Sequence, residues 1–292
     1  MPETGSKIMV KQELLDEKLV LEQTSHYKLS IQVSLDGFSF CCLDDRTKRY
    51  VAVKDYTFAN ISSSFEEACF NIAGIVNDEE LLKQPYKEIR CMLVAPSTTL
   101  VPSSLFVEGK AFSYIKNLIS LPEGEVESFS CKLSDSSITA VFAYPKILTS
   151  LIREISPEAK FYSYSIPFIN KQISEHTASP AQLAMFICGN TACYSLIQNK
   201  ALKISTSFTF ESTTDLVYYT LLLLKEHGLK PAEVEVYISG KVEKHSPRHS
   251  ELSQYLPNLA FDCVPRGYEY SYRFKNKAEH QFSNLFKLVE CE

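Results

Sequence analysis

The residues best suited to holding a ligand lie in turns that follow strand-like segments. Gly189, Asn190 and Thr191 form one such turn, and Ser239 and Gly240 form another. Backbone amides in a glycine-containing turn can hold an anionic group such as a phosphate. One hypothesis is therefore that these five residues bind a nucleotide or another small molecule without hydrolysing it.

Carboxylates that could take part in acid–base chemistry gather at other turns. Asp36, Asp44 and Asp45 form one group, and residues 78–80, with the sequence Asp-Glu-Glu, form a second. Both groups lie in predicted turns, where polar side chains are common for conformational reasons. We therefore expect solvated loop carboxylates rather than a general acid–base pair.

Metal-binding and nucleophilic sites find little support in the sequence. His245 and His249 have the four-residue spacing of two ligands on one helical face, but Pro247 lies between them and a third ligand would have to come from afar. We predict no metal site there. The nine cysteines include no CxxC pair, so we expect reduced thiols that pack as small hydrophobes. Neither a G-x-S-x-G motif nor a P-loop occurs.

The candidate turns belong to a strand–strand–strand–helix–strand pattern that occurs twice. Its first copy has strands at Lys28–Ser34, Gly37–Leu43, Arg49–Tyr56 and Ile89–Ala95, with a helix from Ser64. The second has strands at Leu183–Cys188, Ala192–Gln198, Ala201–Phe210 and Val234–Ile238, with a helix from Thr213. This repetition predicts an α/β fold of two related domains, each a mixed sheet flanked by helices, with a cleft between them.

We place the first domain at residues 1–178 and the second at residues 179–292. The first domain is expected to contain an inserted segment around residues 97–144, which begins with a loop rich in proline and serine. In the second domain, the helix Thr213–His227 is apolar on nearly every face. That pattern predicts burial on more than one side.

Composition excludes several classes of partner. The formal net charge of −5 and the mixing of basic with acidic residues argue against a nucleic-acid binder, which needs a basic face. No apolar run is long enough to insert in a membrane, and the first residues lack the apolar core of a signal peptide. We therefore expect a cytoplasmic protein.

Three short motifs in this pattern resemble those of the actin-like ATPase superfamily, which includes Hsp70, sugar kinases and actin-like proteins of pilus assembly. The chain looks most like an uncharacterised family from Bacteroidetes with this fold, which has ribonuclease H-like domains. The resemblance implies an Asp-x-Gly in the first hairpin and another in the second, which together anchor Mg²⁺ and phosphates. Here Gln32 and Ile187 stand at the two Asp positions.

The remaining motif positions are mixed. Ser34 replaces the first motif's glycine, Gly189 keeps the second, and Asp36–Gly37 lies beyond the first strand, in the turn itself. Ile238–Ser239–Gly240 matches the adenosine motif of the superfamily, but Lys241 stands where relatives usually carry a second glycine. The resemblance thus implies the fold together with a degenerate active site that lacks both metal-anchoring carboxylates.

These observations favour a non-catalytic scaffold or interaction module, with no cofactor and no metal, whose partner is another protein. Two alternatives stay open. The residues Gln32, Ser34, Gly189, Asn190, Thr191, Ser239 and Gly240 could bind a nucleotide or other ligand in the cleft without hydrolysis. The chain could also be an active ATP-dependent phosphotransferase whose carboxylate comes from Asp36 or Asp44.

Overall fold

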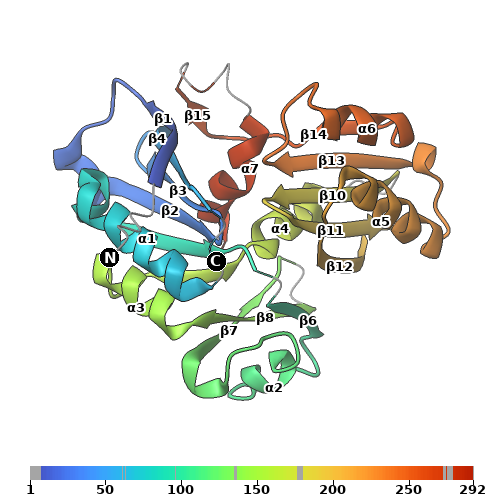
Figure 1. Ribbon diagram of the computed structural model, residues 1–292, viewed down its shortest axis with the longest axis horizontal. Coiled ribbons are helices and arrows are strands. Elements are labelled where there is room, and N and C mark those ends of the chain that lie inside the picture. Colours follow the sequence, from blue (N-terminus) through green and yellow to red (C-terminus); the bar gives the residue numbers. More distant parts are fainter. Residues whose placement is uncertain are drawn as a thin grey trace, which may run out of the picture.

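The computed structural model of the chain describes residues 8–60, 62, 64–95, 97–134, 137–175, 180–271, 274 and 279–291. Two large sheets stand side by side in Figure 1, with helices between them and a smaller sheet below. The structure is mixed α/β, as the sequence predicts. The expected domain boundary between residues 178 and 179 lies outside the described residues and stays a prediction.

The first large sheet is built around a three-stranded antiparallel meander. Strands β2, β3 and β4 are followed in the chain by β5 and β9, which add in parallel, so the sheet order is β1-β4-β3-β2-β5-β9 with β15 beside β4. Helices α1 and α3 pack on each other beside this sheet. The bounds are β1 Ile8–Leu15, β2 Tyr27–Ser34, β3 Gly37–Asp44, β4 Arg49–Phe58, α1 Phe65–Asp78, β5 Glu88–Leu93, α3 Lys146–Ile155, β9 Lys160–Ser163 and β15 Glu269–Tyr270.

The second large sheet repeats this arrangement. Its order is β12-β11-β10-β13-β14, which matches β4-β3-β2-β5-β9 strand for strand and direction for direction. The duplication predicted from the sequence is therefore present in the fold. The bounds are β10 Ala181–Cys188, β11 Thr191–Gln198, β12 Ala201–Thr209, α5 Thr213–Glu226, β13 Val234–Gly240, α6 Pro247–Tyr255 and β14 Leu259–Phe261.

Two helices in equivalent chain positions join the two sheets. Helix α4 (Ser165–Glu175) follows β9 and contacts β10, β11 and β12, whereas α7 (Glu279–Lys287) contacts β13 together with β2 and β3. The side-chain amide of Asn284 donates to the Tyr164 carbonyl at 2.8 Å, and the Tyr50 hydroxyl donates to the Phe286 carbonyl at 2.6 Å. These buried bonds anchor α7 beside the first sheet, and the helix packs on β13 of the second sheet, so α7 links the two sheets.

The inserted segment forms a small sheet of its own. Its order is β6-β8-β7, with α2 against β8. The expected loop after Ser97 is wrong over its first residues, which form strand β6. The bounds are β6 Thr98–Pro102, α2 Ala111–Ile115, β7 Val126–Lys132 and β8 Ile138–Pro145. The short 3-10 helices of the described residues are η1 Leu21–His26, η2 Glu80–Lys83, η3 Glu123–Glu125, η4 Pro231–Glu233 and η5 Leu288–Glu290.

Helix α5 corrects one prediction. A Ser212–Asp215 capping box starts the helix, and one face is buried against the second sheet. The opposite face is not covered, since Tyr218 is 60% exposed and Tyr219 and Leu222 are exposed as well. The prediction that this helix is buried on more than one side is therefore wrong. Among the described residues, no helix is both long and apolar enough to cross a bilayer.

Candidate functional site

The first hairpins of the two sheets touch at their turns. The β2–β3 turn carries Asp36, and the β10–β11 turn carries Gly189 in a left-handed conformation with φ +57°. A Cβ atom at Gly189 would lie 3.3 Å from the Oδ2 atom of Asp36, so the carboxylate packs directly on the opposing turn. The two turns that the resemblance assigns to phosphates thus close on each other.

Asp36 is held by partners from both sheets. The Ser34 hydroxyl donates to its Oδ1 atom at 2.5 Å, and the Lys241 ammonium donates to its Oδ2 atom at 3.1 Å. The side chain is 17% exposed, so the expected solvated loop carboxylate is wrong here. Burial alone would raise the pKa of Asp36, but the charge of Lys241 and the Ser34 hydrogen bond outweigh burial and hold that pKa below its usual range.

Lys241 directly follows β13 and reaches from the second sheet toward the first. Its backbone N–H donates to the Ile187 carbonyl at 2.8 Å, which anchors the residue beside β10. Burial favours a neutral amine, yet the neighbouring Cys188, Asp36 and Asp55 side chains keep the pKa of Lys241 above its ordinary value. The residue therefore presents a stable positive charge to the carboxylates of the first sheet.

Gly240 allows Lys241 to take this place. It has φ +88°, and a Cβ atom there would lie 2.0 Å from the Ile187 carbonyl oxygen. Only glycine fits such a close approach of two backbones. The glycine of the adenosine motif is thus explained by strand packing alone.

The two predicted metal positions border almost no free space. Gln32 from β2 and Ile187 from β10 line a cavity of about 10 Å³ together with Lys241 and Asp55. A cavity of this size holds at most about one water molecule. Sequence reasoning missed Asp55, a buried β4 residue whose carboxylate accepts a 2.6 Å hydrogen bond from the Ser39 hydroxyl. Its position opposite β3 is the signal that could have found it.

Among the other predicted site residues, Gly240 also lines this cavity, whereas Ser34, Gly189, Asn190, Thr191 and Ser239 do not. Ile187 is fully buried within the core of the second sheet. The Ser239 hydroxyl donates to the Met185 carbonyl at 3.3 Å, and the Asn190 carbonyl accepts from the Phe210 N–H at 2.9 Å. Thr191 pairs with Cys188 at the start of β11. Whether any of them contacts a ligand stays a prediction.

The remaining titratable candidates serve the fold. Asp44 is buried and accepts from the backbone N–H of Arg46 at 3.0 Å, while Glu79 is bound by Lys54 and the Tyr56 hydroxyl. These two carboxylates therefore also differ from the solvated side chains that we expected. The His249 ring stacks on Phe261. In the part of the chain that the structure describes, no three His, Cys, Asp or Glu side chains could hold a metal ion together.

Comparisons with known proteins agree with the fold. A Bacteroides thetaiotaomicron protein with an actin-like ATPase fold and unknown function is 20% identical, with a TM-score of 0.76 over 94% of this chain and 99% of that one. The solved PilM-PilN type IV pilus biogenesis complex contains a chain that is 11% identical, with a TM-score of 0.57 over 90% of this chain and 97% of that one. No curated protein matches the sequence.

The two solved structures establish an actin-like ATPase fold, as the motifs implied, and neither carries over an activity at these identities. A family model described as a protein of unknown function (DUF3822) matches residues 16–259, which is most of the chain. The chain therefore belongs to the DUF3822 family.

Proposed function

We propose that the protein is a non-catalytic member of the actin-like ATPase fold, which acts as a scaffold or interaction module for another protein. One observation carries the proposal: the ammonium of Lys241 is bound by Asp36 between the two hairpin turns, where active relatives are expected to hold Mg²⁺. The neighbouring Gln32 and Ile187 add no negative charge. A divalent cation would have to displace the ammonium of Lys241 from the Asp36 carboxylate before it could bind there.

The alternative of a nucleotide bound without hydrolysis is less well supported. Ligand sites for molecules of this size span roughly 300 Å³ or more, whereas the space beside Gln32 and Lys241 is about 10 Å³. Binding would require the two turns to separate and the contact between Asp36 and Lys241 to break. The ion pair therefore opposes the opening that a nucleotide needs.

An active phosphotransferase with displaced carboxylates is also poorly supported. Asp36 is engaged by Ser34 and Lys241, and Asp44 lies at the far end of the eight-residue strand β3, roughly 25 Å along the sheet. Asp36 is thus already bound in an ion pair, and Asp44 lies too far from the hairpin turns to act on a phosphate held there.

A protein partner and a cytoplasmic setting have independent support. PilM shares the fold and was solved in a complex with PilN, so this architecture can serve protein assembly. All nine cysteines are free thiols, which suits a reducing compartment.

The proposal is tested by thermal shift with ATP, ADP and GTP, each with and without Mg²⁺, and by phosphate release from ATP. We expect no stabilisation by any nucleotide and no release above background. Mg²⁺-dependent phosphate release that falls in a Ser34→Ala variant would overturn the proposal, because that variant removes only the hydroxyl bound to Asp36.

A further inference from the structure

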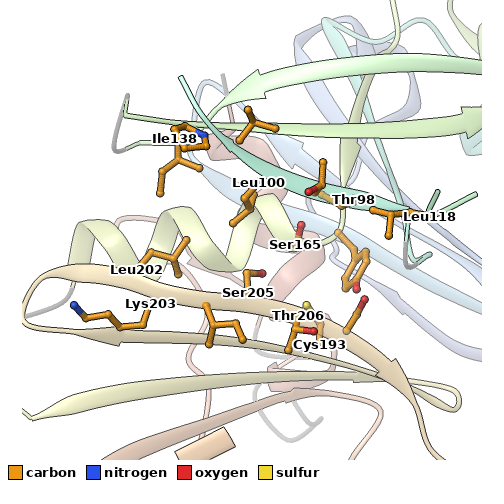
Figure 2. A pocket seen from close by; sticks show the side chains of 16 residues that line it. Thr98, Leu100, Leu118, Ile138, Ser165, Cys193, Leu202, Lys203, Ser205 and Thr206 are labelled. Atoms are coloured by element: carbon orange, nitrogen blue, oxygen red, sulfur yellow. The ribbon is translucent and has the colours of Figure 1, made fainter. Parts of the chain in front are cut away.

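Two sheet edges face each other across a groove that the closed cleft does not involve. Strand β6 is an edge of the small inserted sheet, and β12 is an edge of the second large sheet. Figure 2 shows their side chains pointing toward each other, with helix α4 behind them and Ser165 at the floor. The space between these edges, here called the β6–β12 groove, measures about 730 Å³.

The main chain of β6 leaves hydrogen-bonding groups free on the groove side. In its antiparallel pairing with β8, the Ser97 carbonyl accepts from Ala143 and the Ser103 N–H donates to Ser137. Successive residues of an antiparallel strand point their main-chain groups to opposite edges. The N–H and C=O groups of Thr98 and Leu100 therefore point away from β8 and toward the groove.

The same alternation applies to β12. The Phe210 N–H donates to the Asn190 carbonyl, which directs the even-numbered residues from 204 to 208 toward β11. The main-chain groups of Ser205 and Ser207 therefore point to the free edge. Within the described ranges, the main-chain groups of Thr98, Leu100, Ser205 and Ser207 have no backbone hydrogen bond, whereas the Pro102 carbonyl at the end of β6 accepts one from the Leu105 N–H. Unpaired edges of this kind bind an added strand.

We propose that an extended segment of a partner protein, about five residues long, adds as a strand between β6 and β12. This inference rests on the proposed function and names the chemistry of the partner. A residue in a packed strand occupies on the order of 160 Å³, from the usual strand spacing, sheet thickness and rise, so the groove holds about five residues. That length agrees with the five residues of β6.

The lining of the groove specifies the side chains of this segment. Leu100 on β6 and Leu202 on β12 both line the groove, so alternate side chains of the segment are apolar. Lys203 is the one charged side chain among the described lining residues, and it is exposed at the Ile138 end of the groove in Figure 2. The segment therefore carries a carboxylate at that end, where it can pair with Lys203.

The test uses the full chain and a phage-displayed library of random seven-residue peptides, followed by anisotropy titration of the selected peptides. A Ser205→Pro variant removes one groove-side N–H without touching the ladder to β11, and Ser205→Ala is its matched control because it removes only the hydroxyl. A Lys203→Glu variant reverses the charge at the end of the groove. Hydrogen exchange of the wild-type chain reports which amides the peptide protects.

We expect peptides that alternate apolar with polar residues and carry a carboxylate. Ser205→Pro should weaken their binding at least about tenfold and Ser205→Ala less than about twofold. Lys203→Glu should weaken binding about tenfold, and a peptide with Lys in place of its acid should restore it. Thr98, Leu100, Ser205 and Ser207 should gain amide protection in the wild type, which decides the matter if the proline variant fails to fold.

The proposal is overturned by recovery of no peptide that binds below about 100 μM, or by peptides that bind the proline and charge-reversed variants as well as the wild type. Dimerisation of the chain that protects the same four amides would assign the groove to a second copy instead. Phosphate release measured on the same preparation distinguishes failure of the proposed function from failure of the groove proposal. ATP hydrolysis would refute the proposed function, whereas absence of both hydrolysis and peptide binding would refute only the groove.

Discussion

The Nζ atom of Lys241 lies 3.1 Å from the Oδ2 atom of Asp36 and joins two hairpin turns that belong to different sheets. Both side chains are mostly buried, at 22% and 17% exposed. The pair closes the cleft at the one place where relatives with this fold are expected to admit a metal and phosphates. The ion pair thus joins the two halves of the molecule, and it is called the clamp below.

Removal of either partner of this clamp should destabilise the protein. Lys241→Met leaves a largely buried carboxylate without its cation, and Asp36→Asn leaves the ammonium without its anion, so each should lower the free energy of unfolding by about 1–3 kcal/mol. The double variant should lose less than the sum of the two. Urea denaturation of the four proteins measures this coupling, and a coupling of less than about 0.5 kcal/mol would show that the contact contributes nothing.

The same pair predicts a specific response to acid. Because the folded protein holds the pKa of Asp36 below the ordinary value of 3.8, the unfolded state binds a proton more readily, and the stabilisation is present above that value. The difference in unfolding free energy between wild type and Asp36→Asn should be constant from pH 7 to about pH 5 and should shrink below about pH 4. Denaturation at a series of pH values checks this, since the other carboxylates cancel in the difference. A gap that widens in acid would contradict the assignment.

The sequence predicted the strands well because local signals define them. Alternating residues in β2 and the Asp36–Gly37 turn are enough to predict a hairpin. The contact between Asp36 and Lys241 could not be predicted, although Lys241 stood out as a replacement for a glycine, because it depends on how the two sheets face each other. The predicted burial of the helix face that carries Tyr218 was wrong for a related reason. An apolar composition does not indicate whether another element packs against a helix face.

Substitutions at Gly240 and Gly267 allow the cost of an unfavourable backbone conformation to be measured apart from the cost of a steric clash. Both have similar positive φ angles, +88° and +84°, but a Cβ atom at Gly240 would lie 2.0 Å from the Ile187 carbonyl oxygen whereas one at Gly267 would meet nothing within 4 Å. Gly267→Ala should therefore cost about 1–2 kcal/mol of backbone strain. Gly240→Ala should cost at least about 2 kcal/mol more, as measured by thermal or urea denaturation. Equal costs would mean that the two strands separate without penalty.

The cysteines should differ sharply in reactivity. Cys263 is exposed and Cys131 is partly covered, while the other seven are buried. Burial raises the pKa of Cys69 to about 11 and that of Cys188 to about 12, which leaves little reactive thiolate at neutral pH. Ellman's reagent should therefore modify one thiol rapidly in the native protein and nine after denaturation. A Cys263→Ser variant should lack the rapid phase, and two or more rapid native thiols in that variant would contradict the buried assignment.

A second buried ion cluster should respond very differently to changes at its two ends. Asp262 binds the ammonium of Lys287 through Oδ2 and that of Lys171 through Oδ1 at 2.8 Å, and the Lys287 side chain is only 2% exposed. Asp262→Ala should lower the free energy of unfolding by about 3–5 kcal/mol because it leaves a fully buried charge without a partner. Lys287→Met should be nearly neutral, since the apolar chain fills the same space and Asp262 keeps Lys171.

The cost of Asp262→Ala should fall as pH rises. Burial already lowers the pKa of Lys287 in the wild type, against the opposing charge of Asp262, and loss of that charge lowers the pKa further. The unfolded state then holds its proton to higher pH than the folded state does, so the stability of the variant increases as the pH approaches 10.5, the ordinary lysine value. Denaturation of both proteins at pH 7 and pH 9 measures this difference. A cost that is the same at both values would show that Lys287 keeps its proton by finding another partner.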